Sequence, residues 1–459
     1  MRRCALLLAF VSAALAAPGP AGWVPVRWPW SDAASLELLA TTPVNCLLLR
    51  DLTPEFAAAA AERGVSVLAI IPPTPDAVAA TRKAVAAKAA GIVLEGDFPD
   101  AVVAAIRDAA AALPVIQIGP RSRLKPGASP ISATNQGVWP GIGAPDENAR
   151  RAGPTSSNAW IDTNTGFLRG AHAAGATILW IANEPPPKTA VTLEGYQHAI
   201  ADAAMSGARW VVAFDADLAA RLAKRDARAV TQWRRMADFL VYFEQHPEWR
   251  DMHEFGQLAV VQDPARGVLL SGGILDMIAV KHAPVRPIAS PQLSAEKLAG
   301  ATLAVNVDQD ALTPDQKEIL RAFASAGNTL LNVPPAPVDQ SRVDRVTLDK
   351  SELERTNAIW TDVNNMIGRR NLGVRLFNVA SVLSNALESA DGKTLIIHLV
   401  NYADYPVQNV TVHFLGDFKR AVLLGPENSI KKLDIYPTDD SHGVDVDQVG
   451  ACATIRLEK

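Results

Sequence analysis

Cysteine is scarce in this sequence, with three in 459 residues. That number excludes a small fold held together by disulfide bridges, and we expect Cys46 and Cys452 to be buried thiols. An excess of either charge is also lacking, because 44 Lys and Arg stand against 48 Asp and Glu and leave a net charge of −4. Nothing in this balance would attract a nucleic-acid backbone, so we expect no nucleic-acid partner.

The motifs of several enzyme classes are missing as well. The sequence has no Gly-x-Ser-x-Gly, P-loop or Gly-x-Gly-x-x-Gly motif, and its eight His residues form no His-x-His or Glu-x-x-His pair. We therefore expect neither a metal centre nor a cofactor. No segment reaches the 18 uninterrupted apolar residues that indicate a membrane span, so we expect no membrane anchor.

The first residues have the pattern of an export signal. Met1-Arg2-Arg3 is a short basic start, residues 4–15 are apolar, and Ala14-Leu15-Ala16 supplies small residues at a cleavage site. The segment is too short, with its flanks, to span a bilayer. We expect residues 1–16 to be a cleaved signal peptide and the mature protein to be periplasmic or secreted.

Residues 17–253 alternate between short apolar runs and Ala-rich helical stretches, which is typical of βα units on a parallel sheet. The predicted strands are Trp23–Trp28, Asn45–Arg50, Val65–Ile71, Gly91–Glu95, Pro114–Ile118, Gly137–Ile142, Thr177–Glu184 and Arg209–Asp215. Eight such strands favour an α/β fold with a (β/α)₈ barrel, closed by a final long helix from about Asp217 to Gln245. The first and sixth strands contain proline, so either could be a loop that leaves the barrel incomplete.

Two further units follow the barrel. Residues 254–337 repeat the alternation of strands and helices on a smaller scale and predict a flavodoxin-like α/β domain. Residues 338–374 read as a linker with a polar helix. From residue 375 to residue 459, short β-branched runs separated by turns predict an antiparallel β-sandwich.

The ending of the middle unit resembles the glutamine-amidotransferase-like domain of family 42 β-galactosidases. The resemblance is carried by Leu312-Thr313-Pro314-Asp315-Gln316, by Leu320-Arg321-Ala322-Phe323 and by Ala326-Gly327-Asn328-Thr329-Leu330-Leu331. The unit has no cysteine and therefore lacks the amidotransferase nucleophile. The resemblance implies a supporting role, or one in forming a homo-oligomer.

The order of the three units resembles a glycoside hydrolase over nearly the whole mature length. The segment from Gly392 to Tyr402 looks like the C-terminal β-domains of many such enzymes. In a barrel of this kind, reactive groups come from the carboxyl ends of the strands. Glu95 ends the fourth predicted strand and Glu184 ends the seventh.

Two carboxylates at opposite strand ends suit glycoside hydrolysis. The retaining mechanism needs a separation of about 5–5.5 Å, and a separation beyond about 10 Å would serve neither stereochemical course. The placement resembles that of the clan A hydrolases, which would make Glu95 the acid/base and Glu184 the nucleophile. That clan also keeps an arginine where Arg50 lies, and such a cation would keep Glu184 ionised.

One motif departs from the clan pattern. The clan carries Asn-Glu-Pro on strand four, whereas here Asn183-Glu184-Pro185 falls on the seventh predicted strand. If two of the predicted strands are false, Glu184 becomes the acid/base, and Asp215 or Asp217 becomes the nearest nucleophile. A Tyr that would orient the nucleophile is not found in the sequence.

Further residues near strand ends are candidates for binding substrate. Indole faces stack on sugar rings, and polar side chains bind hydroxyls. The candidates are Arg50, Asn183, Trp139, Trp160, Asp215 and Asp97. Structural roles stay open: Glu95 could cap a helix, Arg50 could pair with a neighbouring carboxylate, and the prolines after Glu184 could simply make a rigid turn.

The sequence thus predicts an exported glycoside hydrolase that acts on a glycan with two carboxylates and no cofactor. The alternative is a protein of another class, a non-catalytic carbohydrate-binding or scaffold protein built on a degenerate hydrolase barrel.

Overall fold

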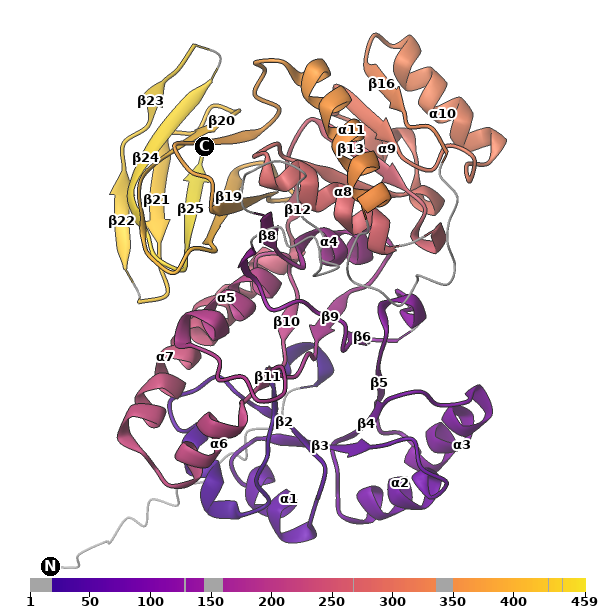
Figure 1. Cartoon of the computed structure of the whole chain (residues 1–459), viewed down its shortest axis with the longest axis vertical. Coiled ribbons are helices and arrows are strands. Elements are labelled where there is room, and N and C mark those ends of the chain that lie inside the picture. Colours follow the sequence, from indigo (N-terminus) through magenta and orange to yellow (C-terminus); the bar gives the residue numbers. More distant parts are fainter. Residues whose placement is uncertain are drawn as a thin grey trace, which may run out of the picture.

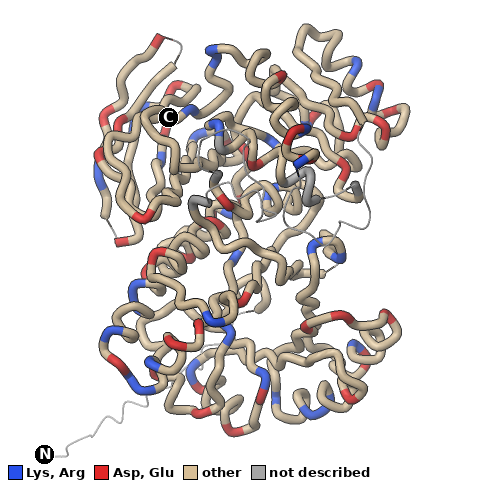
Figure 2. The backbone as a smooth tube through the Cα atoms, viewed as in Figure 1, with Lys and Arg blue, Asp and Glu red and all other residues tan. Residues whose placement is uncertain are grey.

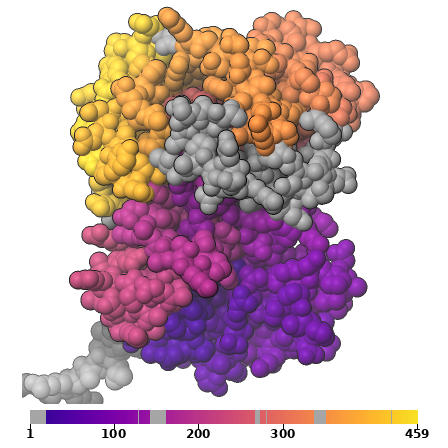
Figure 3. Space-filling model, viewed as in Figure 1, coloured from indigo at the N-terminus to yellow at the C-terminus, as the bar shows by residue number. Residues whose placement is uncertain are grey.

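The computed structural model describes residues 19–127, 129–143, 160–266, 268–335, 350–427, 429–439 and 441–459. The predicted signal peptide, residues 1–16, lies outside these ranges. Figure 1 shows a barrel at one end of the molecule, with a small α/β unit and a β-sandwich side by side at the other. The backbone tube in Figure 2 and the space-filling view in Figure 3 show the same arrangement.

A parallel sheet of nine strands forms a nearly closed barrel, in the order β10-β9-β6-β5-β4-β3-β2-β1-β11. The strands are β1 (Pro25–Arg27), β2 (Cys46–Leu49), β3 (Ser66–Ile71), β4 (Gly91–Glu95), β5 (Val115–Gly119), β6 (Ile131–Thr134), β9 (Ile178–Ile181), β10 (Arg209–Trp210) and β11 (Val212–Ala213). Only Val211 separates β10 from β11, and its N–H still bonds to the carbonyl of Ile181. The two are halves of one interrupted strand, which pairs with β9 on one side and β1 on the other. Seven of the eight predicted strands coincide with strands of the barrel, and the sixth does not.

Strand side chains alternate between two clusters, as the two-residue period of a strand requires. Leu48, Ile70 and Trp180 belong to a cluster made almost entirely of strand residues, which fills the barrel. Leu47 and Leu49 of β2 pack instead with residues of the surrounding helices. The carboxyl ends of the strands are left free to carry polar groups.

The sixth barrel strand is not where the sequence pattern indicated. The position belongs to β6, Ile131–Thr134, and the predicted segment 137–142 lies beyond it. Residues Gly141–Gly143 form β7, which pairs antiparallel with β8 (Trp160–Asp162) in a separate two-stranded sheet. Proline and glycine disfavour a central strand, whereas all four residues of β6 are buried.

The helices cover the outside of the barrel (Figure 1). They are α1 (Pro54–Ala61), α2 (Ala77–Ala86), α3 (Asp100–Ala110), α4 (Thr165–Ala173), α5 (Leu193–Ala204), α6 (Ala216–Ala223) and α7 (Ala227–Glu244). The single long helix predicted from Asp217 to Gln245 is therefore wrong. Arg225 adopts a φ of 56°, which ends α6, and the side chain of Asp226 caps α7. No helix in the described ranges is long and apolar enough to cross a membrane.

The middle unit is a small α/β domain with a parallel sheet, as the alternation of strands and helices predicted. Its strands are β13 (Leu258–Gln262), β14 (Arg286–Ala289), β15 (Leu303–Asn306) and β16 (Thr329–Asn332), all parallel, in the order β14-β13-β15-β16. Its helices are α8 (Val268–Val280), α9 (Ala295–Leu298), α10 (Pro314–Ser325) and α11 (Lys350–Ile367). Thr313 and Gln316 form a capping box that starts α10.

The C-terminal part consists of two antiparallel sheets, as predicted. One contains β12 (His253–Glu254), β18 (Val382–Glu388), β19 (Thr394–Asn401), β25 (Cys452–Glu458), β21 (Arg420–Leu424) and β22 (Ile430–Leu433). The other contains β17 (Val374–Phe377), β20 (Val407–Phe414), β24 (His442–Val449) and β23 (Tyr436–Pro437). Cys46 and Cys452 are free and buried, as expected.

A buried polar cluster joins the three parts. Asp202 of α5 is 0% exposed and accepts four hydrogen bonds, from Thr163, from Tyr402 at the end of β19, and two from Asn164. Asp276 of the middle unit accepts from the backbone N–H of Gly166, 2.7 Å away, at the start of α4. We call Asp202, Asp276 and their hydrogen-bond partners the junction cluster.

Candidate active site

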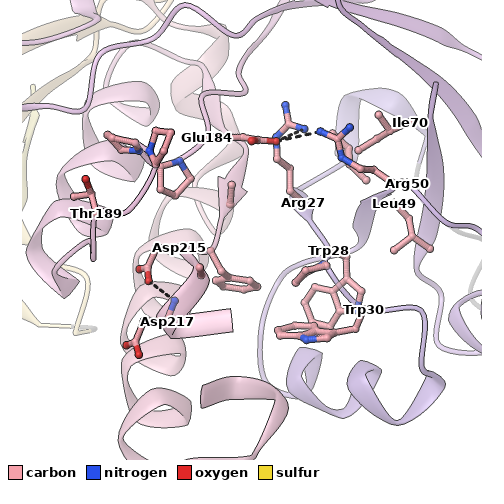
Figure 4. Close-up of a pocket in the computed structure, with 18 of the residues that line it drawn as sticks. Arg27, Trp28, Trp30, Leu49, Arg50, Ile70, Glu184, Thr189, Asp215 and Asp217 are labelled. Atoms are coloured by element: carbon pink, nitrogen blue, oxygen red, sulfur yellow. Dashed lines mark hydrogen bonds and ion pairs between the residues drawn. The ribbon is translucent and has the colours of Figure 1, made fainter. Parts of the chain in front are cut away.

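A pocket of about 690 Å³ opens at the carboxyl ends of the barrel strands. That volume lies in the range of small-molecule sites. The loops after β1, β2, β9 and β11 line it. Figure 4 shows Arg27, Arg50 and Glu184 directed toward one another on one side, with Trp28 and Trp30 on another.

Two arginines and two glutamates form one ion-paired group at the top of this pocket. Nη2 of Arg50 lies 3.0 Å from Oε2 of Glu95 and 3.4 Å from Oε1 of Glu184. Arg27 also pairs with Glu95, and its Nη1 lies 3.4 Å from Oε1 of Glu184. Each carboxylate therefore contacts both guanidinium groups. We call these four residues the pocket cluster.

The shared arginine limits the separation of the two carboxylates. Oε2 of Glu95 and Oε1 of Glu184 both lie close to Nη2 of Arg50. The distance between the two oxygens therefore cannot exceed the sum of their distances to that nitrogen, which is 6.4 Å. The structure thus brings together the two residues that the sequence singled out. The limit is far below the 10 Å beyond which the pair would serve no glycosidase mechanism.

The backbone on either side explains where Glu184 lies. It follows β9 by three residues and precedes Pro185-Pro186-Pro187, whose φ angles are fixed. Nε1 of Trp139 donates to the carbonyl of Glu184 at 3.2 Å, and Nδ2 of Asn183 donates to the carbonyl of Gly137 at 2.8 Å. These bonds tie the loop after β6 to the loop that carries Glu184.

Exposure divides the pocket cluster into an inner and an outer pair. The side chains of Arg27 and Glu95 are 9% and 16% exposed, whereas those of Arg50 and Glu184 are 58% and 56% exposed. Glu184 lines the pocket, but Glu95 is not among the lining residues. Both oxygens of Glu95 take part in ion pairs, whereas Oε2 of Glu184 accepts no hydrogen bond from the described residues.

Aromatic rings form another wall of the pocket. The rings of Trp28 and Trp30 meet edge to face at 4.9 Å, and Phe214 lies 5.7 Å from Trp30. Trp28 is 3% exposed and belongs to the core, while Trp30 and Phe214 are only partly buried. Partly exposed rings in a pocket suit the apolar face of a sugar ring.

The carboxylates considered as alternative nucleophiles serve the fold. Asp215 lines the pocket, but its Oδ1 caps α6 and its Oδ2 accepts from Tyr196 OH at 3.1 Å. Asp217 also lines the pocket, is largely exposed and pairs with Arg221 at 2.8 Å. They were alternatives only if two of the predicted strands before Glu184 were false. The strand β9, the last one before Glu184, does hold the seventh position in the barrel.

The other predicted substrate-binding residues lie away from the pocket lining. Asp97 is exposed and pairs with Arg123. Trp139 and Asn183 hold the loop of Glu184 and do not line the pocket. Trp160 begins β8, but its side chain falls outside the described part of the structure.

Arg27 is the member of the pocket cluster that the sequence interpretation missed. The first strand was predicted to end at Trp28, which placed Arg27 inside the strand and not at its carboxyl end. Arg27 is the last residue of β1, and an arginine that ends an apolar strand is a signal that could have identified it. Over the residues that can be described, no three His, Cys, Asp or Glu side chains gather in an arrangement able to hold a metal ion.

Comparisons with known proteins find a similarity in fold to a solved glycoside hydrolase. No family model and no curated protein matches the sequence. The structure is similar to α-L-fucosidase isoenzyme 2 from Paenibacillus thiaminolyticus, with 12% identity, 95% of this chain and 99% of that chain covered, and a TM-score of 0.60. A rhamnosidase from Novosphingobium sp. PP1Y also matches, with 13% identity, 78% and 38% coverage, and a TM-score of 0.46. At such identities the similarity concerns the fold alone.

Proposed function

We propose that the protein is an exported glycoside hydrolase and that Glu184 and Glu95 are its pair of carboxylates. The observation that carries the proposal is the pocket cluster, in which both carboxylates contact Arg27 and Arg50 beside a pocket of suitable size. The similarity in fold to a fucosidase supports it. The roles implied by the clan A resemblance belong to the same proposal.

In the proposed retaining mechanism, Glu184 is the nucleophile. It borders the pocket, and its Oε2, which accepts no hydrogen bond from the described residues, forms a bond with the anomeric carbon as the bond from that carbon to the leaving oxygen breaks. Glu95 gives its proton to the leaving oxygen, and then takes a proton from the water that hydrolyses the glycosyl ester. Arg50, which is mostly exposed, has to leave Glu95 as the substrate enters.

The direct test is hydrolysis of a panel of aryl glycosides, including α-L-fucosides and α-L-rhamnosides. We expect wild type to release the aryl group from at least one of them and Glu184→Gln to lose about 10³-fold in kcat. Asp97→Asn is the matched control, because Asp97 is an exposed, ion-paired carboxylate outside the pocket. Unchanged turnover in Glu184→Gln would remove Glu184 from the mechanism.

A second experiment distinguishes the two roles. Glu184→Gly removes the nucleophile and leaves space at the anomeric carbon, so added azide should restore turnover and yield a glycosyl azide. Glu95→Gln should instead slow substrates with poor leaving groups most, since these depend on protonation. Azide rescue in the Glu95 variant alone would reverse the assignment.

A non-catalytic carbohydrate-binding protein is the second candidate. The ion pairs on both oxygens of Glu95, and its position behind the pocket lining, favour this function. Calorimetry with glycans that the enzyme assay leaves intact would then show binding without turnover.

The export signal has its own test, because the mature protein from its natural host should begin at Ala17.

A further inference from the structure

A second cavity lies where the barrel meets the β-sandwich. Its volume is about 140 Å³, and it shares no lining residue with the pocket described above. On the barrel side it is lined by Ser206, which follows α5, and by Trp249 in the short helix Pro247–Asp251. On the sandwich side it is lined by Asn385 of β18 and His398 of β19.

Three buried polar atoms of residues that line this cavity have no hydrogen-bond partner within the described residues: Oγ of Ser206, Oδ1 of Asn385 and Nε2 of His172. Ser206 is 5% exposed and Asn385 is 2% exposed, yet neither Oγ of Ser206 nor Oδ1 of Asn385 makes a hydrogen bond with any residue that the structure describes. Nδ2 of Asn385 donates to the carbonyl of Met205 at 2.8 Å, which fixes the amide with Oδ1 as a pure acceptor. Buried polar atoms in folded proteins nearly always have partners. These atoms are therefore available for hydrogen bonds to a molecule bound in the cavity.

The charged groups around the cavity are already paired. Arg250 lies 2.6 Å from Glu244, and Glu254 lies 2.7 Å from Arg169. Each pair places a donor of the guanidinium on a carboxylate oxygen, so neither charge needs a counter-ion from a ligand.

Two of the three histidines that line the cavity add no charge at neutral pH. Burial lowers the pKa of His398 to about 3, and it also lowers the pKa of His172, which bonds through Nδ1 to the carbonyl of Ala176. His246 stacks on Trp249 with ring centroids 4.1 Å apart and contacts Glu248. The unused hydrogen-bonding capacity of the cavity thus belongs to neutral groups.

From this geometry we infer that the cavity binds a small neutral polyol, between glycerol and a single sugar ring in size, through Ser206 and Asn385. The volume equals that of roughly four to five water molecules, which is too small for an oligosaccharide. Asn385 requires a donor, and a hydroxyl group supplies one while it also exchanges a hydrogen bond with Ser206. A carboxylate or an inorganic phosphate would set acceptors against the acceptor of Asn385.

Such a ligand would connect two parts of the chain, because Ser206 belongs to the barrel and Asn385 to the sandwich. A molecule that binds only the folded state raises the midpoint of thermal unfolding in a saturable way. The inference does not depend on the proposed hydrolase activity, because the two sites are separate.

The test is thermal unfolding of the full chain as glycerol, D-xylose, D-glucose or sodium acetate is added. We expect at least one of the three polyols to raise the midpoint by about 1–2 °C with a saturating dependence, and acetate to have no such effect. Ser206→Val should abolish the saturable part and Ser206→Thr, which keeps the hydroxyl, should retain it. Ala204→Met, which fills the cavity without touching its polar atoms, should abolish it as well.

Glu184→Gln locates the binding. A saturable effect that persists in this variant supports the second cavity, and one that disappears assigns the polyol to the main pocket and overturns the inference. A crystal structure with the effective polyol should show it between Ser206 and Asn385. Ordered water molecules alone in that cavity, or a linear dependence identical in all variants, would also overturn it.

Discussion

The pocket cluster and the junction cluster each hold two carboxylates, but the two clusters differ in their access to water. In the pocket cluster, Arg50 and Glu184 are more than half exposed, and their charges are balanced by each other across 3.4 Å. In the junction cluster, Asp202 is 0% exposed and is held by hydroxyl and amide groups, among them the hydroxyl of Tyr402 at 2.6 Å. The buried carboxylate of Asp202 holds parts of the chain together, whereas the exposed carboxylate of Glu184 is accessible to a ligand in the pocket.

The sequence context of the two clusters differs in the same way. Members of the pocket cluster end barrel strands or follow them, where a change of side chain leaves the strand pairing intact. Asp202 lies within α5, and its partners come from the loop before α4 and from the end of β19. The junction cluster therefore joins segments about 200 residues apart, and we expect its loss to lower the free energy of unfolding of the whole protein.

The largest effect is expected for Asp202→Ala. This change leaves Tyr402, Thr163 and Asn164 without their common acceptor, and each unsatisfied buried group costs about 1–3 kcal/mol. We expect the free energy of unfolding to fall by about 5 kcal/mol, as measured by urea denaturation at pH 7. Glu184→Gln, the matched change in the pocket cluster, should cost less than about 1 kcal/mol. The opposite order would break the comparison.

A change in pH separates the clusters further. Burial raises the pKa of Asp276 from 3.8 to about 7. Because this acid binds its proton more tightly in the folded state, its contribution to stability is complete below about pH 4 and is lost as the pH rises to 7. Relative to wild type, Asp276→Asn should therefore gain up to about 4 kcal/mol in unfolding free energy between pH 4 and pH 7.

The difference between the two proteins is the quantity to measure. His398 has a pKa that burial lowers to about 3, so it contributes a loss of stability on the acid side that is common to both proteins and cancels. Urea denaturation at pH 4, 5, 6 and 7 supplies the data. Parallel curves for wild type and Asp276→Asn would show that Asp276 does not titrate in this range.

The smallest effect is expected within the pocket cluster itself. Arg50→Gln removes two ion pairs of a side chain that is 58% exposed, and we expect a loss of less than about 1 kcal/mol. Arg27→Gln affects a side chain that is 9% exposed and leaves Glu95 with one cation instead of two, so its cost should be larger, about 2 kcal/mol. Thermal unfolding of the two variants in parallel would sharpen the comparison, and equal losses would erase the distinction between inner and outer pairs.

The fold could be predicted well where burial decides it. Apolar strands such as Gly91–Glu95 and the capped helix Pro314–Ser325 stand out, because their sequence pattern and their packing agree. The sixth barrel strand was misplaced because Ile131-Ser132-Ala133-Thr134 has too few apolar residues to stand out, although the barrel buries all four. The break between α6 and α7 rests on one left-handed residue, Arg225, which helical periodicity does not register.

The site was predicted in part. Glu95, Glu184 and Arg50 were expected together because strand ends share one edge of a barrel, and the structure brings them together. The contributions of Arg27 and Trp139 depend on the register of β1 and on the path of the loop after β6. Arg27 could have been noticed as a residue at a strand end, but its contacts, like those of Trp139, are consequences of tertiary structure that single strands do not show.

The three prolines that follow Glu184 decide what one wall of the pocket can offer a ligand. Pro185, Pro186 and Pro187 all line the pocket, and none of them has a backbone N–H. This wall can present carbonyl oxygens and ring faces but no amide proton. A sugar hydroxyl turned toward these prolines has to act as the hydrogen-bond donor. An ether or carbonyl oxygen placed there would find no donor on them, so this side of the pocket favours ligands that donate.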